Sequence, residues 1–272
     1  METAAESPRI DTSRPHPARM YDYYLGGTSH YAVDARAAEE VLAAMPGTRV
    51  AARVNRDFMA RATRTLAAGH GVRQFLDIGT GIPTEPNLHQ VAQSVDARCR
   101  VVYTDNDPIV LHHARALLRS TPEGRTAYVH ADVTAPETIL DSAGLRETLD
   151  LERPVALSVN ALFHFITDAM GPHHVLRTLL DALAPGSFLV MTHATADFVD
   201  ELTAERTESV LRTYREAGTD LRPRSLDEFR SFFTGLEPLE PGLVVPQRWR
   251  PDCGGSLGDA EIPGYAGVAR LP

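Results

Sequence analysis

From residue 72 onward the chain alternates short apolar segments with amphipathic ones, and this alternation limits the possible folds more than any other feature. Strands that alternate with helices usually pair in parallel, and the helices then cover both faces of the sheet. The sequence therefore predicts an α/β fold. The expected strands are 72–78, 100–105, 126–130, 154–160 and 187–193. The expected helices between them are 86–95, 108–119, 136–149 and 172–183.

The segment before this region is expected to be helical. Residues 15–70 are rich in alanine and arginine, and the pairs Gly26-Gly27 and Pro46-Gly47 interrupt them. In the last part, apolar residues at a spacing of four predict one buried helical stripe, made of Val50, Val54, Phe58, Ala62 and Leu66. We interpret 1–70 as an N-terminal helical cap or lid and 71–272 as the main domain, the two forming one structural unit.

The last third of the chain is expected to add two helices and two strands. Residues 203–217 and 226–233 have helical patterns, and Ser225 with Glu228 matches a capping box at the start of the second. These helices form an insertion before the final strands, which are expected at 236–245 and 265–271.

Composition excludes several classes of function. All 27 basic residues are arginine, so the chain can form neither a lysine Schiff base nor a lysine-containing phosphate loop. The net charge of −9 argues against a nucleic-acid partner, because no basic excess exists to neutralise phosphates.

No signal peptide and no run of about 18 apolar residues is found, so we expect a cytoplasmic protein without membrane contact. Cys99 and Cys253 lack metal-ligand spacing; we expect reduced thiols and no metal.

The turn after the first expected strand carries the strongest functional signal. Asp77 is followed by Gly79, Thr80 and Gly81, and the glycines let the backbone approach a ligand closely. The next strand ends at Asp105, a carboxylate suited to accept hydrogen bonds from two ribose hydroxyls. An acidic residue two positions before the first glycine is typical of S-adenosylmethionine sites. We therefore predict this cofactor, with Asp77 near its ammonium group and the loop amides near its carboxylate or sulfonium.

Two further strand ends carry candidate residues. Asp132 could accept a hydrogen bond from the adenine amine, and Asn160 would lie beside the reactive methyl group. In parallel sheets, ligands bind at these carboxyl ends. The alternative for each residue alone is that it only caps the following helix.

A nicotinamide cofactor is the main competitor for the glycine loop. Its motif needs a third glycine so that the helix can pack closely on the strand. Here that position is Thr84, and Pro83 and Pro86 stiffen the loop. The sequence therefore favours S-adenosylmethionine.

These motifs resemble those of class I S-adenosylmethionine-dependent methyltransferases. Asp77 to Gly81 matches their first motif, and Asp105 to Pro108 matches the ribose-binding second motif, with Asn106 where an apolar residue often lies against adenine. His130 to Val133 matches the adenine-amine position, which implies that Asp132 and Val133 contact adenine. The resemblance implies a Rossmann-like seven-stranded sheet whose last strand is antiparallel.

A closer resemblance, covering nearly the whole chain, is to an actinobacterial S-adenosyl methyltransferase family long called a domain of unknown function. The matching segments are Ile10 to Gly27, Arg73 to Asp77, Ala182 to Ser187, His193 to Asp197 and Gly264 to Ala269. Where the family commonly has Lys-Asp-Asn, this chain has Thr28, Ser29 and His30. The family resemblance supplies no substrate.

The tyrosine-rich segment before Gly26 could close over the cofactor. Arg14, Arg19, Tyr21, Tyr23 and Tyr24 precede the Gly-Gly pair, and we expect Tyr21 and Tyr24 to contact the cofactor as part of a lid. The alternative is a static brace that holds the segment on the domain.

His164 follows the fourth expected strand and is the candidate catalytic base, since histidine can take a proton near neutral pH. The alternative is a histidine wedged between aromatic neighbours and bonded to the backbone. His193 is a weaker candidate of the same kind. Arg53, Asn55, Arg56 and Arg61 are expected to be solvated; the alternative is that Asn55 or Arg56 reaches the site.

The sequence as a whole predicts a methyltransferase that acts on a small molecule, because no basic surface exists for a large anionic one. Two alternatives stay open: a non-catalytic protein that binds the cofactor for regulation, and a nicotinamide-dependent oxidoreductase. Neither the acceptor nor the oligomeric state is predicted.

Overall fold

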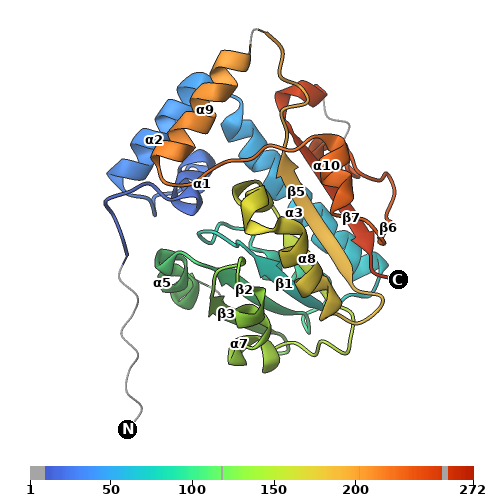
Figure 1. Ribbon diagram of the computed structural model, residues 1–272. Coiled ribbons are helices and arrows are strands. Elements are labelled where there is room, and N and C mark those ends of the chain that lie inside the picture. The colour runs from blue at the N-terminus through green and yellow to red at the C-terminus, as the bar shows by residue number, and fades with distance from the viewer. Residues whose placement is uncertain (1–9, 118, 202, 253–256) are drawn as a thin grey trace.

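The computed structural model describes residues 10–117, 119–201, 203–252 and 257–272. Its centre is one seven-stranded sheet in the order β3-β2-β1-β4-β5-β7-β6 (Figure 1). The strands are β1 (Gln74–Ile78), β2 (Arg100–Asp105), β3 (Arg125–His130), β4 (Ala156–Val159), β5 (Phe188–Ala194), β6 (Glu237–Pro238) and β7 (Gly264–Arg270). β7 runs antiparallel to β5 and β6, and the pairs among β1 to β5 are parallel. The predicted sheet, including its antiparallel last strand, is confirmed.

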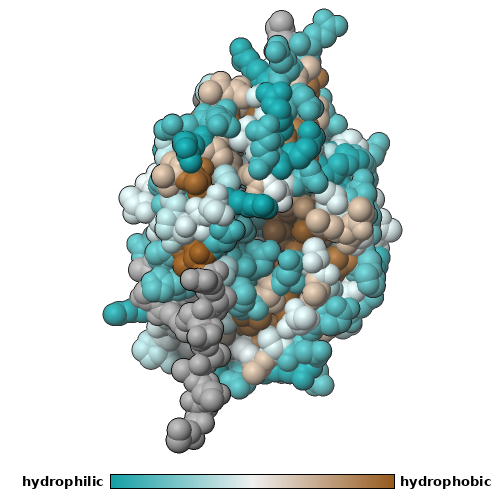
Figure 2. All heavy atoms as spheres, turned by 60° about the vertical axis from the view of Figure 1, so that its left-hand side comes forward, coloured by the Kyte–Doolittle hydropathy of each residue, from teal (hydrophilic) through white to brown (hydrophobic). Residues whose placement is uncertain are grey.

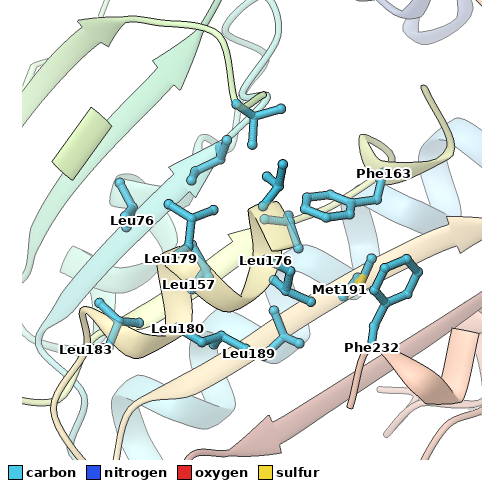
Figure 3. Close-up of a cluster of buried hydrophobic side chains, with 14 of the residues drawn as sticks. Leu76, Leu157, Phe163, Leu176, Leu179, Leu180, Leu183, Leu189, Met191 and Phe232 are labelled. Atoms are coloured by element: carbon cyan, nitrogen blue, oxygen red, sulfur yellow. The ribbon is translucent and has the colours of Figure 1, made fainter. Parts of the chain in front are cut away.

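Helices cover both faces of the sheet, as the strand–helix alternation predicts. One face packs against α3 (Thr48–Gly69) and α4 (Leu88–Val95). The other packs against α6 (Pro136–Leu140), α7 (Ala143–Arg146), α8 (Pro172–Asp181) and α10 (Leu226–Ser231). Leucines of α8 point onto Leu157 and Leu189 of the central strands (Figure 3). Each fully buried leucine contributes about 1.5–3 kcal/mol, so this contact is a main source of the domain's stability.

A helical cap stands at the carboxyl ends of the strands. It contains α1 (Pro17–Leu25), α2 (Ala32–Ala44) and α9 (Ala204–Glu216), which lie together at the upper left of Figure 1. Met20, Val41 and Tyr214 share one buried core in this cap. The predicted breaks near Gly26 and Pro46 do separate the three N-terminal helices. The insertion helix α9, distant in sequence, thus completes the N-terminal cap, whereas most of α3 belongs to the layer that covers the sheet.

Three expectations about individual elements are wrong. Helix 136–149 divides at Ser142, whose side chain accepts from the Leu145 amide and begins a second helix, α7. Of the expected strand 236–245, only β6 and an isolated bridge at Val244 form. The prolines inside the segment have no N–H group to donate to the hydrogen bonds of a sheet. Val50 is 40 % exposed, since it lies in the first turn of α3, while the rest of the predicted stripe is buried.

Candidate functional site

The candidate residues gather where the direction of the strand order reverses. From β1 the chain adds β2 and β3 on one side and β4 and β5 on the other. The carboxyl ends of β1 and β4 are therefore the position at which sheets of this kind bind ligands in a crevice. The backbone at Gly79, after β1, lies directly against the side chain of Leu162, after β4. Figure 2 shows a hollow with hydrophobic residues at its floor on the face that carries the cap.

Asp77 lies at this crevice and is half-buried. Its carboxylate accepts a hydrogen bond from the Thr80 hydroxyl. Burial raises the pKa of Asp77, while hydrogen bonds from Thr80 and Ser158 and the positive charge of Arg56 act in the opposite direction. A desolvated carboxylate in this position gains most from a cationic partner such as an ammonium group.

Asp105 ends β2 and is only 6 % exposed. Its two oxygens accept from backbone amides, Oδ2 from Gly81 at 2.8 Å and Oδ1 from Asp107 at 2.9 Å. Burial raises its pKa, and these two amides counteract that shift. A carboxylate offers about four acceptor positions, so two stay available for the hydroxyls of a ribose.

The backbone amides of the glycine loop already donate hydrogen bonds to other groups of the protein. Gly79 and Thr80 both donate to the Thr104 carbonyl, at 2.8 and 3.1 Å, and Gly81 donates to Asp105. Asp77, the loop and Asp105 are therefore brought together as predicted. The expected donation of these amides to a cofactor carboxylate does not match this arrangement, since each N–H has a partner within the fold.

The two glycines of the loop should respond differently to alanine. Both have a positive φ, +70° at Gly79 and +66° at Gly81, which costs a non-glycine residue about 1–2 kcal/mol. A Cβ at Gly79 would also lie 2.8 Å from the Leu162 methyl carbons, whereas one at Gly81 would meet nothing within 4 Å. We expect Gly79→Ala to lose more stability in urea unfolding than Gly81→Ala, because only Gly79→Ala adds a steric clash. Equal losses of stability in the two variants would mean that the Leu162 side chain can move away from the new methyl group at no energetic cost.

Asp132 and Val133 follow β3, and Asn106, which follows β2, contacts Asp132. The Asn106 amide donates to Asp132 Oδ2 at 3.3 Å, and Thr134 donates to Oδ1 through its amide and its hydroxyl. Asp132 is exposed, while the side chain of Val133 is buried. Asp132 thus closes a turn at Thr134 and does not cap the following helix α6, whose N-cap is Ala135. Its exposed carboxylate can also reach a ligand.

Asn160 carries an acceptor with no partner among the described residues. Its amide donates to Ser158 Oγ at 2.9 Å, but Oδ1 is buried and makes no hydrogen bond. An unpaired buried acceptor costs about 1–3 kcal/mol, and such exceptions often mark a functional site. This oxygen is suited to accept from a ligand donor in the crevice.

A chain of hydrogen bonds links the cap to the turn that follows Asn160. Tyr21 OH accepts from the Asn55 amide at 2.8 Å, and Asn55 Oδ1 accepts from the Thr192 hydroxyl at 2.7 Å. Thr192 in turn accepts from the backbone amide of Ala161, a residue with a φ of +52°. This backbone strain is held in place by the surrounding contacts, a pattern common at binding sites. Sequence reasoning missed Thr192, which has no local signal.

The two tyrosines that are predicted to contact the cofactor lie in different surroundings. Tyr21 is half-buried and belongs to the chain that reaches the β4 turn. Tyr24 is 2 % exposed and lies in the core of the cap, where its hydroxyl meets that of Tyr214 at 3.3 Å. Tyr21 is therefore brought to the site, and Tyr24 is placed in the packing of the cap.

His164 is buried and bonded to the backbone. Its Nδ1 accepts from the Ala194 amide at 3.3 Å, so in the neutral ring Nε2 carries the proton and can donate but not accept. Burial, together with the charges of His193 and Arg224, holds its pKa well below the usual range. This geometry favours the structural alternative. His193 is similar: burial lowers its pKa to about 4, and its ring contacts Arg224.

The four polar positions on α3 do not share a solvated face. Arg53 is exposed as expected, but Asn55 reaches Thr192. Arg61 is buried and donates to the carbonyls of Pro246 and Trp249. Arg56 donates to the carbonyls that follow the glycine loop. The geometry thus favours the alternative in which Asn55 or Arg56 reaches the site.

A buried ion cluster beside Asp105 was not predicted. Arg19 Nε lies 3.1 Å from Asp107 Oδ2, and Arg19 Nη1 lies 3.6 Å from Asp34 Oδ2. All three side chains are less than 5 % exposed. The cluster fixes the N-terminal segment over the end of β2. The only sequence signal for it was an arginine on the apolar side of α1.

Within the described ranges, no group of three or more His, Cys, Asp or Glu side chains could hold a metal ion. Cys99 is a buried free thiol, while Cys253 lies outside the described residues. No helix in the described part of the chain has the length and apolar character needed to cross a membrane.

Comparison with known proteins identifies the family. The model of the S-adenosyl methyltransferase family matches residues 3–272. A DUF574 family protein from Streptomyces avermitilis is 48% identical, with a TM-score of 0.93 over 97% of this chain and 100% of its own. A proposed methyltransferase from Thermobifida fusca is 36% identical, with a TM-score of 0.88 over 99% of each chain. The search of curated proteins found no match. The chain therefore belongs to the S-adenosyl methyltransferase family, within the class I methyltransferase fold.

Proposed function

We propose that this chain binds S-adenosylmethionine at the carboxyl ends of β1 to β4 and transfers its methyl group to a small-molecule acceptor. The observation that carries the proposal is Asp105, a buried strand-end carboxylate with two acceptor positions left over after its bonds to the loop. The family assignment supports the same cofactor.

The residues present match the polar groups of the cofactor. Asp105 would hold the two ribose hydroxyls, and Asp132 would accept from the adenine amine. Asp77 and the unpaired Oδ1 of Asn160 would accept from the ammonium group. Open space above Gly81 lets the cofactor approach the backbone there.

The cofactor, when bound, supplies a methyl group on a positively charged sulfur, which makes transfer favourable without further activation. The protein then needs to align the acceptor and exclude water. The hydrogen-bond chain from Tyr21 to Ala161 fixes the turn beside the site, and the cap shields it. His164 would donate a hydrogen bond from Nε2 and would not act as a base. The methyl acceptor must therefore be nucleophilic without losing a proton to His164.

Ligand-induced stabilisation tests the cofactor. S-adenosylhomocysteine at 100 times its Kd should stabilise the native state by about 2.7 kcal/mol, which raises the thermal midpoint by roughly 5–10 °C. NAD at the same concentration should leave the midpoint unchanged, because the third glycine of its motif is absent. A shift with NAD alone would point to an oxidoreductase.

Transfer itself needs a second measurement. Incubation with methyl-labelled S-adenosylmethionine and a small-molecule extract should give a labelled small product. Cofactor binding without any labelled product would favour the regulatory alternative.

A further inference from the structure

Arg56 is a half-buried cation close to the site, and it forms no ion pair with any described residue. It projects from α3, and its Nη2 donates to the carbonyls of Thr84 at 2.5 Å and Pro86 at 2.6 Å. These carbonyls lie three and five residues after Gly81. The guanidinium is therefore held by neutral acceptors at one nitrogen, and its charge is not compensated there.

The rest of the guanidinium is available to a ligand. A guanidinium has five N–H donors, and the two on Nη2 are used, so three remain on Nε and Nη1. In the described part of the chain, neither of these nitrogens makes a hydrogen bond. Burial raises the pKa of Asp77 and of Tyr21, and the positive charge of Arg56 opposes both shifts, in keeping with its position beside the loop.

The proposed cofactor carries one group for which the glycine loop offers no donor. Its α-carboxylate needs N–H groups or a cation, and the amides of Gly79, Thr80 and Gly81 already donate to Thr104 and Asp105. The carboxylates at Asp77 and Asp105 would repel it. A planar guanidinium is well suited to bind a carboxylate through two parallel hydrogen bonds.

We infer that Arg56 binds the α-carboxylate of S-adenosylmethionine, while Asp77 and Asn160 receive the ammonium group. This inference rests on the proposed function, since it assumes that this cofactor occupies the site. It gives α3 a role in cofactor recognition besides covering the sheet. It also explains why an arginine without an acidic partner is kept half-buried at the edge of the loop.

Two ligands that differ only in the carboxylate test the inference. Calorimetry should compare S-adenosylmethionine with decarboxylated S-adenosylmethionine, which keeps the sulfonium and the ammonium. Arg56→Met is expected to weaken binding of the first about 10- to 100-fold, as for a lost charged hydrogen bond. It should leave binding of the second within about twofold. Arg56→Lys, which keeps the charge without the planar fork, should recover part of the loss.

Arg53→Met is the matched control, because Arg53 lies on the same helix and is exposed. It should change neither affinity. Equal weakening of both ligands by Arg56→Met would overturn the inference, since Arg56 would then only anchor the loop. So would an unchanged affinity for S-adenosylmethionine, the result expected if Arg56 instead binds an anionic acceptor. Failure of the unsubstituted protein to bind S-adenosylmethionine would overturn the proposed function itself, and with it this inference.

Discussion

Replacing Arg19 by methionine is expected to lower the free energy of unfolding by about 3–5 kcal/mol, the usual cost of leaving a buried charge without its partner. The guanidinium lies between two carboxylates, Asp34 at 0 % and Asp107 at 3 % exposure. Within the described residues, methionine would leave Asp34 with backbone amides only and Asp107 with only the His16 ring, 3.2 Å away, and one backbone amide. Urea unfolding should show a lower midpoint with an unchanged slope.

The Arg19 variant also addresses the role of the N-terminal segment. Met20 and Tyr24 on the same helix are buried in the cap, which favours the static brace over a mobile lid. We therefore expect residues 10–31 to be cleaved faster in Arg19→Met in limited proteolysis. The exposed Arg14 provides the control, and Arg14→Met should behave as the unsubstituted protein. A stability loss below about 1 kcal/mol, typical of a surface ion pair, would contradict the buried cluster.

Replacing Asp105 by alanine is expected to weaken binding of S-adenosylhomocysteine by about 2–4 kcal/mol, because charged hydrogen bonds of about 1.5–3 kcal/mol each are lost and partly replaced by water. The variant should also be less stable, since the amides of Gly81 and Asp107 lose their acceptor. Calorimetry well below the thermal midpoint separates the two effects, with the folded fraction checked by circular dichroism.

Asp132→Ala is the comparison for Asp105. Asp132 is exposed, and water can replace its single expected bond to adenine, so we expect a loss below about 1 kcal/mol. If folded Asp105→Ala protein binds as tightly as the unsubstituted chain, the ribose lies elsewhere. If Asp132→Ala has the larger effect, the adenine contact dominates binding.

Local pattern was enough to predict the sheet and the strand ends that form the site. Asp105 could be placed at the end of a strand because Asp107 and Pro108 begin a helix directly afterwards, and the side chain of Asp107 does accept from the Ile109 amide. The capping box of Ser225 and Glu228 is confirmed for the same reason. In these cases the deciding contacts lie within a few residues, so the sequence alone contains them.

The contacts that complete the site join residues far apart in the chain. Asn55 bonds to Thr192 across 137 positions, and Arg19 bonds to Asp107 across 88. The periodicity of apolar residues on α3 predicts which side chains face the sheet, but it does not predict which groups contact the polar side chains. Only the packing of α3 and the cap against the carboxyl ends of the strands decides this. A buried polar group must find whichever partner the folded chain brings within about 3 Å, and that partner is determined by topology and not by local sequence.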